Sequence, residues 1–298
     1  MRGFTHDSLL PAIIMTAREL VAGITDLLSF SAVYFRVNEL LQDPRSSADE
    51  IGVVISHEPG LAARLLKIVN SAYYGFPGKI DTLSRAVMIF GTRELESLVL
   101  ATVAVDAFKR ISTDLVDMSD FWHHSVYCGL AARLLARRFG VLHPERLFVA
   151  GLLHDVGQLI IYHQIPELAR EALAVAEPTD DGLYRAEQDL LGFTHGDVAL
   201  ELFEIWGLPT SIKEAAAFHH ECGRAREFPL DTALVHLANS VANAVEPSRN
   251  IPECRPVRDP RAWELTGLSE DDLDRALEDA NEQFLDVVRI ISPNKPLV

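Results

Sequence analysis

This sequence contains few cysteines, fewer basic than acidic residues, and no long apolar run. The three cysteines, Cys128, Cys222 and Cys254, are odd in number and widely spaced, so they form neither a disulfide framework nor a zinc pattern. We therefore expect a reduced, cytoplasmic protein. The 27 Lys and Arg residues stand against 43 Asp and Glu residues, and the resulting net charge is −16. This charge opposes contact with nucleic acid phosphates and anionic membrane surfaces unless a local basic patch overrides it.

Two further absences narrow the class of protein. No apolar run reaches the ~18 residues that a membrane-spanning helix needs, so no transmembrane segment is expected. Near the N-terminus, no small-residue cleavage site follows an apolar core, so no secretion signal is expected either.

Apolar residues recur at helical spacing along almost the whole chain, whereas the alternation typical of β-strands is scarce. The sequence therefore predicts an all-α fold. A change in composition near residues 112–117 marks a boundary between two lobes. We assign residues 1–22 to a leader helix or linker that either reaches a partner or packs on the body. Residues 23–115 then form an N-terminal helical lobe, and residues 116–298 form a second helical lobe with a C-terminal helix.

The helical segments follow from apolar periodicity and from cap signals. Ser47 with Glu50, and Ser211 with Glu214, have the spacing of a capping box. Thr194 with Asp197 gives a similar helix start. Loops are expected at residues 177–182 and 246–260. Helices are expected at residues 8–28 (one or two), 31–42, 51–56, 61–70, 83–90, 92–110, 121–139, 146–163, 195–206, 212–220, 231–245 and 269–291.

The helices at 83–90 and 92–110, joined at Gly91, resemble a helix-turn-helix motif in length. The second helix carries Arg93 but also Glu94 and Glu96, and it then becomes apolar. Two packed scaffold helices explain this pattern better than DNA reading does.

The stretch from Val149 to Ile161 is the most informative part of the chain. Ten of its thirteen residues are apolar or Gly, which is the profile of a helix buried on most sides. His154 and Asp155 lie in its middle, and a buried charge is costly unless it is paired or bound to metal. A core histidine hydrogen-bonded to its neighbours, with a capping or ion-paired Asp155, would also account for the pair.

Other histidines follow at intervals where helices are expected to converge. Each has an ordinary explanation when taken alone: a core or surface position for His123 and His124, solvation for His195, and a helix C-terminus for His219 and His220. Imidazole and carboxylate together suit divalent Fe, Mn, Zn or Ni. The candidate metal ligands are His124, His154, Asp155, His195, His219, His220 and Asn239.

The order H…HD…H…HH…D/N on an α-bundle resembles the HD superfamily of metal-dependent phosphohydrolases. A closer resemblance is to the HDOD (HD-related output domain) family, and it spans roughly residues 23–290. The stretches that carry it are residues 41–47, 55–71, 80–91, 122–125, 151–157, 206–209 and 219–220. The resemblance implies an N-terminal helical lobe packed on an HD-like helical bundle, and a bacterial regulatory role downstream of sensory domains.

Departures from the catalytic relatives weaken the case for an enzyme. The HD-GYP type of cyclic-dinucleotide phosphodiesterase carries Lys three residues after the HD aspartate, where this chain has Gln158, and no Gly-Tyr-Pro segment occurs. Asn239 stands where the superfamily has its last aspartate, and a neutral amide is the poorer ligand for a hard cation. Asp120, four residues before His124, could orient the imidazole, act as a ligand, or simply favour the helix start.

Three functions therefore compete. The first is a signalling module without robust catalysis, whose HD-like pocket is vestigial or binds metal and whose partners are receiver, kinase or cyclase-type proteins. The second is a metal-dependent phosphohydrolase acting on cyclic dinucleotides or nucleotides. In that case His124, His154, Asp155 and Asn239 would hold one ion, and Asp155, His195, His219 and His220 the other. The third is DNA or partner recognition through residues 83–110. The oligomeric state is left open.

Overall fold

The computed structural model describes residues 15–30, 32–245 and 256–291. Residues 8–14 of the first predicted helix and residues 246–255 of the last predicted loop lie outside this part. Within the described ranges every regular element is helical and no β-strand occurs, so the prediction of an all-α fold is confirmed. None of the helices described combines the length and the apolarity that crossing a membrane requires.

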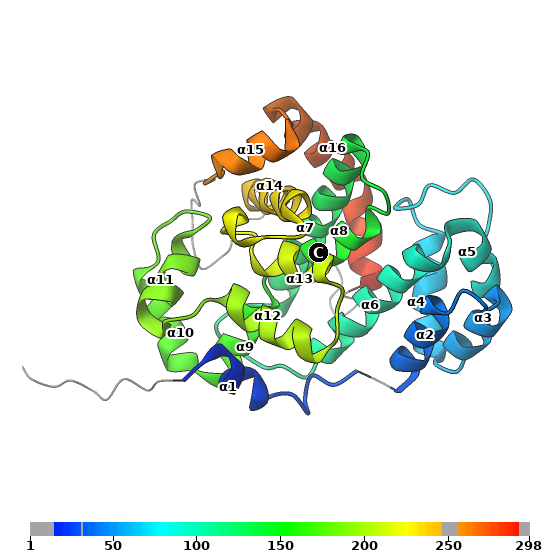
Figure 1. The fold of residues 1–298 in the computed structure, drawn as a ribbon, viewed down its shortest axis with the longest axis horizontal. Helices are drawn as coiled ribbons and strands as arrows, with labels where there is room; N and C mark the ends of the chain where they lie inside the picture. Colours follow the sequence, from blue (N-terminus) through cyan, green and yellow to red (C-terminus); the bar gives the residue numbers. More distant parts are fainter. Residues whose placement is uncertain (1–14, 31, 246–255, 292–298) are drawn as a thin grey trace, which may run out of the picture.

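The helices are distributed over two lobes (Figure 1). They are α1 (Ala17–Ala22), α2 (Ala32–Gln42), α3 (Ala48–Ser56), α4 (Pro59–Val69), α5 (Leu83–Phe90), α6 (Thr92–Phe108), α7 (Met118–Phe139), α8 (Glu145–Leu153), α9 (Val156–Gln164), α10 (Pro166–Val175), α11 (Gly182–Leu191), α12 (His195–Ile205), α13 (Thr210–Ala217), the 3₁₀ turn η1 (Cys222–Arg224), α14 (Pro229–Val245), α15 (Pro260–Thr266) and α16 (Glu270–Ile291).

The N-terminal lobe consists of α2 to α5 at one end of the molecule, with α6 leading toward the centre (Figure 1). The predicted capping box is present at α3, where Ser47 and Glu50 bond each other's backbone amides. Helix α6 packs against α2, α4 and α5, and also against α8 of the second lobe. Its side chains are buried almost without interruption from Leu95 to Phe108. This burial explains the long apolar run and leaves little of α6 to enter a DNA groove.

The second lobe is built around α7, which packs against α8, α14 and α16. Helices α12 and α13 pack on each other, α12 also contacts α9, and α13 contacts α8 and α14. Helix α7 ends at Gly140, whose φ of 80° places it in the left-handed region that favours glycine. The elements that the sequence marks with histidines therefore surround one common interior.

Helix α1 packs against α12 and α9, so the first described part of the chain lies on the second lobe (Figure 1). The indole N–H of Trp206 donates to the carbonyl of Leu28 at 2.9 Å, and the Phe30 ring lies 4.3 Å from the Trp206 ring. The chain crosses to the N-terminal lobe only after this contact. Of the leader assigned to residues 1–22, the described residues 15–22 thus pack on the body, and a role in reaching a partner stays a prediction.

Besides the exact helix ends, four parts of the helix prediction were wrong. Residues 23–28, expected to be helical, form turns after α1. The helix expected at 146–163 is interrupted at His154 and Asp155, which separate α8 from α9. Helices α10, α11 and α15 were not predicted, because their short amphipathic segments resemble polar connections. Ser211 does not cap a helix, since α13 begins at Thr210 after Pro209, with no side-chain cap bond. Glu214 instead accepts hydrogen bonds from the backbone amides of residues 226–228.

A buried ion pair of the second lobe, Arg133 with Glu145, also contacts the N-terminal lobe through Tyr73, and we call it the junction pair. The Arg133 guanidinium on α7 is fully buried and donates to the Glu145 carboxylate at 3.1 Å and to the Tyr73 carbonyl at 3.1 Å. It also lies 3.8 Å from the centre of the Tyr73 ring, an arrangement that favours a cation. Tyr73 packs on Phe148 of α8, so the segment following α4 is anchored on the second lobe.

Candidate metal centre

Five separate parts of the second lobe bring the predicted ligands together into one group, the His/Asp cluster. The contributing residues are His124 from α7, His154 and Asp155 from the break between α8 and α9, His195 from the first turn of α12, His219 and His220 from the segment after α13, and Asn239 from α14. All are buried or nearly so. Among the cluster residues that form ion pairs, His124 has the most exposed side chain, and it is only 14% accessible.

Two glycines allow the helices to approach closely enough for this arrangement. A Cβ added to Gly157 in α9 would lie 1.9 Å from the carbonyl oxygen of His195. A Cβ added to Gly151 in α8 would lie 2.8 Å from the Cα of Gly129 in α7. Both distances are far below van der Waals contact, so a larger residue would push His195 or α7 away from Asp155.

The first half of the cluster consists of Asp155 Oδ1 with His195, His219 and His220. Asp155 Oδ1 lies 3.4 Å from His195 Nε2 and 3.7 Å from His219 Nε2. The ligand atoms of all four residues lie within 4.8 Å of one another. Such a spacing matches a cation site, because ligands at ~2.1 Å around a tetrahedral ion are about 3.4 Å apart.

The second half consists of Asp155 Oδ2 with His124, His154 and Asn239. Asp155 Oδ2 lies 3.1 Å from His154 Nε2 and 3.7 Å from His124 Nε2. His124 Nε2 also lies 3.4 Å from His154 Nε2 and 3.1 Å from Asn239 Oδ1. Asp155 is therefore common to both halves, as a bridging carboxylate would be.

Hydrogen bonds outside the cluster fix the orientation of its imidazoles. The Nδ1–H groups of His154 and His219 donate to the backbone carbonyls of Gly151 and Ala216, each at 2.7 Å. Because Nδ1 of each ring donates outward, Nε2 of each ring faces the interior of the cluster. Outer partners of this kind are typical of metal-binding histidines.

Two of these outer partners are carboxylates that sequence reasoning missed. His195 Nδ1–H donates to Glu187 at 2.7 Å, and the His195 backbone amide donates to the same oxygen at 2.7 Å. His220 Nδ1–H donates to Asp181 at 2.9 Å. Both acids lie around α11, a helix that was not predicted. Nothing in their sequence spacing separates them from surface acids.

Burial and neighbouring charges shift the pKa values in the cluster. Burial alone would raise the pKa of Asp155, but the imidazoles around it, that of His154 first, hold this pKa well below its ordinary value. Burial lowers the pKa values of His219 and His220 well below the ordinary imidazole value, and neighbouring imidazoles add to the effect. Asp155 outweighs the burial of His154 and raises its pKa. Burial would also lower the pKa of His195, but Glu187 outweighs it and raises this pKa. Ionised carboxylate and neutral imidazole are the forms that bind metal, so the shifts of Asp155, His219 and His220 favour binding, whereas an ion must displace a proton from His154 and His195.

The residues present fit a divalent cation. Asp155 Oδ1, His195 Nε2 and His219 Nε2 are buried and have no hydrogen-bond partner in the described part of the protein. Leaving a buried polar atom unpaired costs about 1–3 kcal/mol, and these three atoms face one point. A His/Asp cluster able to bind a metal is thus present.

The other residues singled out in the sequence lie around the cluster rather than in it. His123 faces Ser119 and the ring of Phe284. His236 uses both ring nitrogens elsewhere, donating to the His219 carbonyl and accepting from the Asp259 amide, each at 2.8 Å. Gln158 accepts from the Tyr162 hydroxyl at 3.3 Å. Asp120 lies one turn before His124 on α7, and its role in orienting that imidazole stays a prediction.

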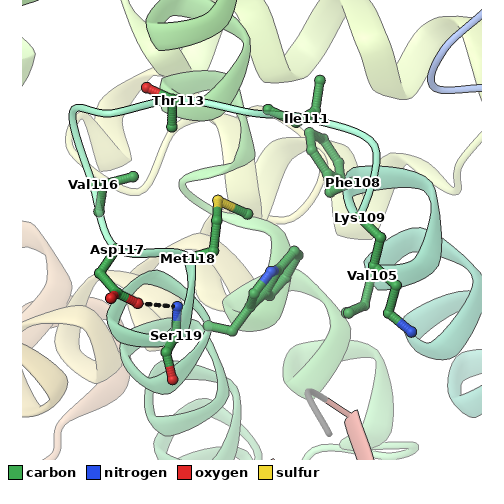
Figure 2. Close-up of a pocket in the computed structure, with 10 residues that line it drawn as sticks. Val105, Phe108, Lys109, Ile111, Thr113, Val116, Asp117, Met118 and Ser119 are labelled. Atoms are coloured by element: carbon green, nitrogen blue, oxygen red, sulfur yellow. Dashed lines mark hydrogen bonds between the residues drawn. The ribbon is translucent and has the colours of Figure 1, made fainter. Parts of the chain in front are cut away.

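A separate cavity of about 430 Å³ lies where the chain passes from α6 to α7 (Figure 2). Its apolar walls are formed by Val105, Phe108, Ile111, Val116, Met118 and Trp122. The two charged side chains at its edge are engaged within the protein. Lys109 pairs with Asp106 at 2.6 Å, and Asp117 accepts from the Ser119 amide at 2.7 Å. This cavity offers an apolar surface and no cluster residue lines it.

Comparison with known proteins places this arrangement in a family. The family model of the HDOD domain matches residues 27–222. A protein of Treponema pallidum (strain Nichols) carrying only the name "Uncharacterized protein" is 24% identical over 213 residues, which cover 71% of this chain and 41% of that protein. The chain therefore spans less than half the length of this relative.

Solved structures share the fold. A "Putative phosphohydrolase" from Shewanella amazonensis SB2B is 21% identical with a TM-score of 0.71, covering 94% of this chain and 100% of its own. A "Putative signal transduction protein" from Marinobacter aquaeolei VT8 is 17% identical with a TM-score of 0.67, covering 94% and 66%. Likenesses at these identities establish the fold alone, and they confirm an N-terminal helical lobe packed on an HD-like lobe.

Proposed function

Because this chain belongs to the HDOD family, we propose that it is a bacterial, cytoplasmic signal-transduction module whose His/Asp cluster binds a divalent metal without robust catalysis. Its partners would be receiver, kinase or cyclase-type signalling proteins. The metal would be Fe, Mn, Zn or Ni, which imidazole and carboxylate ligands suit. The ligands would be drawn from the seven predicted residues, His124, His154, Asp155, His195, His219, His220 and Asn239.

The burial of the cluster carries this proposal. The side chains of His154, His195 and His219 are at most 1% accessible, and that of Asp155 is 12% accessible. A catalytic metal site keeps a position open to substrate, whereas a structural or sensing site can be enclosed. The ion pairs among the described cluster residues join imidazoles to Asp155, and no Lys or Arg takes part in them. A fixed cation that would stabilise a phosphoryl group is therefore not part of this set.

A second candidate function is a metal-dependent phosphohydrolase. The observation in its favour is the bridging position of Asp155, which gives each half of the cluster its own carboxylate oxygen. Two bound ions would supply Lewis acidity to a phosphoryl group and lower the pKa of a water between them. The chain's own residues would hold this arrangement through the outer bonds to Glu187, Asp181 and the backbone.

Elemental analysis beside a phosphodiesterase screen separates the two functions. The protein is purified without chelator, assayed for bound metal, and incubated with cyclic di-GMP and with nucleotides. We expect bound metal without turnover, and metal loss in His219→Ala. His163→Ala is the matched control, because His163 donates to the Ser112 carbonyl away from the cluster. Turnover that disappears in His219→Ala would establish the enzyme instead, and a protein without metal would contradict both functions.

A further inference from the structure

The two halves of the His/Asp cluster differ in how far their atoms are already paired within the protein. In the first half, three ligand atoms have no hydrogen-bond partner in the described structure: Asp155 Oδ1, His195 Nε2 and His219 Nε2. The side chains of both histidines are 1% accessible, so water does not replace the missing partners from outside. This half is complete only with a ligand that accepts three lone pairs, which describes a cation.

In the second half the ligand atoms pair with one another. Asn239 Oδ1 is a carbonyl oxygen and can only accept, so His124 Nε2 donates its proton to it across 3.1 Å. A nitrogen that carries a proton has no lone pair for a metal. His154 Nε2 lies 3.4 Å from His124 Nε2 and 3.1 Å from Asp155 Oδ2. The amide of Asn239 thus occupies the His124 nitrogen that a second ion would need.

The outer hydrogen bonds reinforce this difference. Two imidazoles of the first half, His195 and His220, donate to the carboxylates of Glu187 and Asp181. In the second half, His154 donates to the neutral carbonyl of Gly151. A carboxylate partner makes an imidazole the more basic ligand and is worth about 10–100-fold in metal affinity.

We propose that the cluster binds one divalent ion in its first half, and that Asn239 keeps the second half closed to a second ion. This inference rests on the proposed function, which requires only that the cluster binds metal somewhere. It adds which half is loaded, the stoichiometry and the residue that limits it. An aspartate at position 239 would supply a charged ligand for a second ion and compensate part of its charge, so Asn239→Asp opens the second half.

The test is metal stoichiometry and affinity, measured with Zn²⁺ and with Mn²⁺ by calorimetric titration and by elemental analysis after gel filtration. Wild type is expected to bind one ion, and Asn239→Asp two. Asn281→Asp is the matched control, because Asn281 Oδ1 also accepts a hydrogen bond, from Tyr127 at 2.6 Å, but lies on α16 outside the cluster. It is expected to bind one ion. Glu187→Gln should bind that ion about 10–100-fold more weakly.

Two single variants of the wild-type protein show which half of the cluster binds the ion, even if Asn239→Asp does not fold. His195→Gln is expected to lose the ion, whereas His124→Gln is expected to keep it with less than a threefold change in Kd. The reverse pattern, or two ions bound by wild type, overturns this inference and leaves the proposed function standing. A folded Asn239→Asp protein that still binds one ion removes Asn239 as the limiting residue. No metal bound by wild type contradicts the proposed function itself.

Discussion

The second lobe contains two buried polar groups that are built in opposite ways. In the junction pair, the Arg133 guanidinium donates hydrogen bonds to Glu145 and to the Tyr73 carbonyl. Of its three nitrogens, only Nη1 lacks a partner in the described structure. In the His/Asp cluster, lone pairs converge and several atoms have no partner. The difference teaches that burial alone does not mark a functional site. A buried charge whose hydrogen bonds end within the protein serves packing, whereas one surrounded by unpaired acceptors serves a ligand.

The largest expected effect is at the junction pair. Arg133→Met leaves the buried Glu145 carboxylate without its charge partner, so we expect a loss of about 3–5 kcal/mol in the free energy of unfolding, measured with urea. Added metal should not restore it. The double variant Arg133→Met/Glu145→Gln should regain much of the loss, because no unpaired charge remains. A loss below ~1 kcal/mol in the single variant would mean that the pair does not hold the lobes.

Added metal should stabilise the protein through the His/Asp cluster, whereas it should not compensate for loss of the junction pair. At a free metal concentration of 100 times Kd, wild type should gain about 2.7 kcal/mol in stability by mass action. Asp155→Asn should abolish this gain, since Asp155 belongs to both halves, while Asp231→Asn should keep it because Asp231 pairs with Arg146 outside the cluster. Melting curves with metal and with chelator measure the effect. If Asp155→Asn gained as much stability from metal as wild type does, the cluster would not be the site at which metal stabilises the protein.

The smallest effect is expected in the N-terminal lobe, where Arg64 of α4 pairs with Asp106 of α6. Burial would raise the pKa of Asp106, but Arg64 and Lys109 outweigh it and lower this pKa. A lowered carboxyl pKa stabilises the fold above the unfolded value of about 3.9, and the contribution is lost as the pH falls through the folded value.

Arg64→Gln should therefore cost less than ~1 kcal/mol at neutral pH, because the pair is partly exposed and screened. The difference from wild type should shrink in acid. Urea unfolding of both proteins at neutral and acid pH measures it. A stability cost as large as that of Arg133→Met, or one that grows in acid, would contradict this prediction. It would mean that the solvent exposure of an ion pair does not determine how much the pair stabilises the protein.

The sequence was informative where periodicity and special residue types coincide. The all-α fold follows from 3.6-residue spacing. The gathering of His124, His154, Asp155 and the later histidines was expected because their order resembles that of the HD superfamily. The break between α8 and α9 was not predictable, because Gly151 and Gly157 lie inside the two helices and neither Gly nor Pro stands at the break itself. Glu187 and Asp181 could not be found either, since only the folded chain brings these acids to the imidazoles.

Helix α1 lies at the edge of the protein, but it packs on two helices that reach the His/Asp cluster. Its two neighbours are α9 and α12, and these are the helices that begin beside Asp155 and at His195. Closely packed helices move as stiff bodies and do not absorb strain softly. A displacement of α1 would therefore move α9 and α12 with it, and so change the 3.4 Å distance between Asp155 Oδ1 and His195 Nε2.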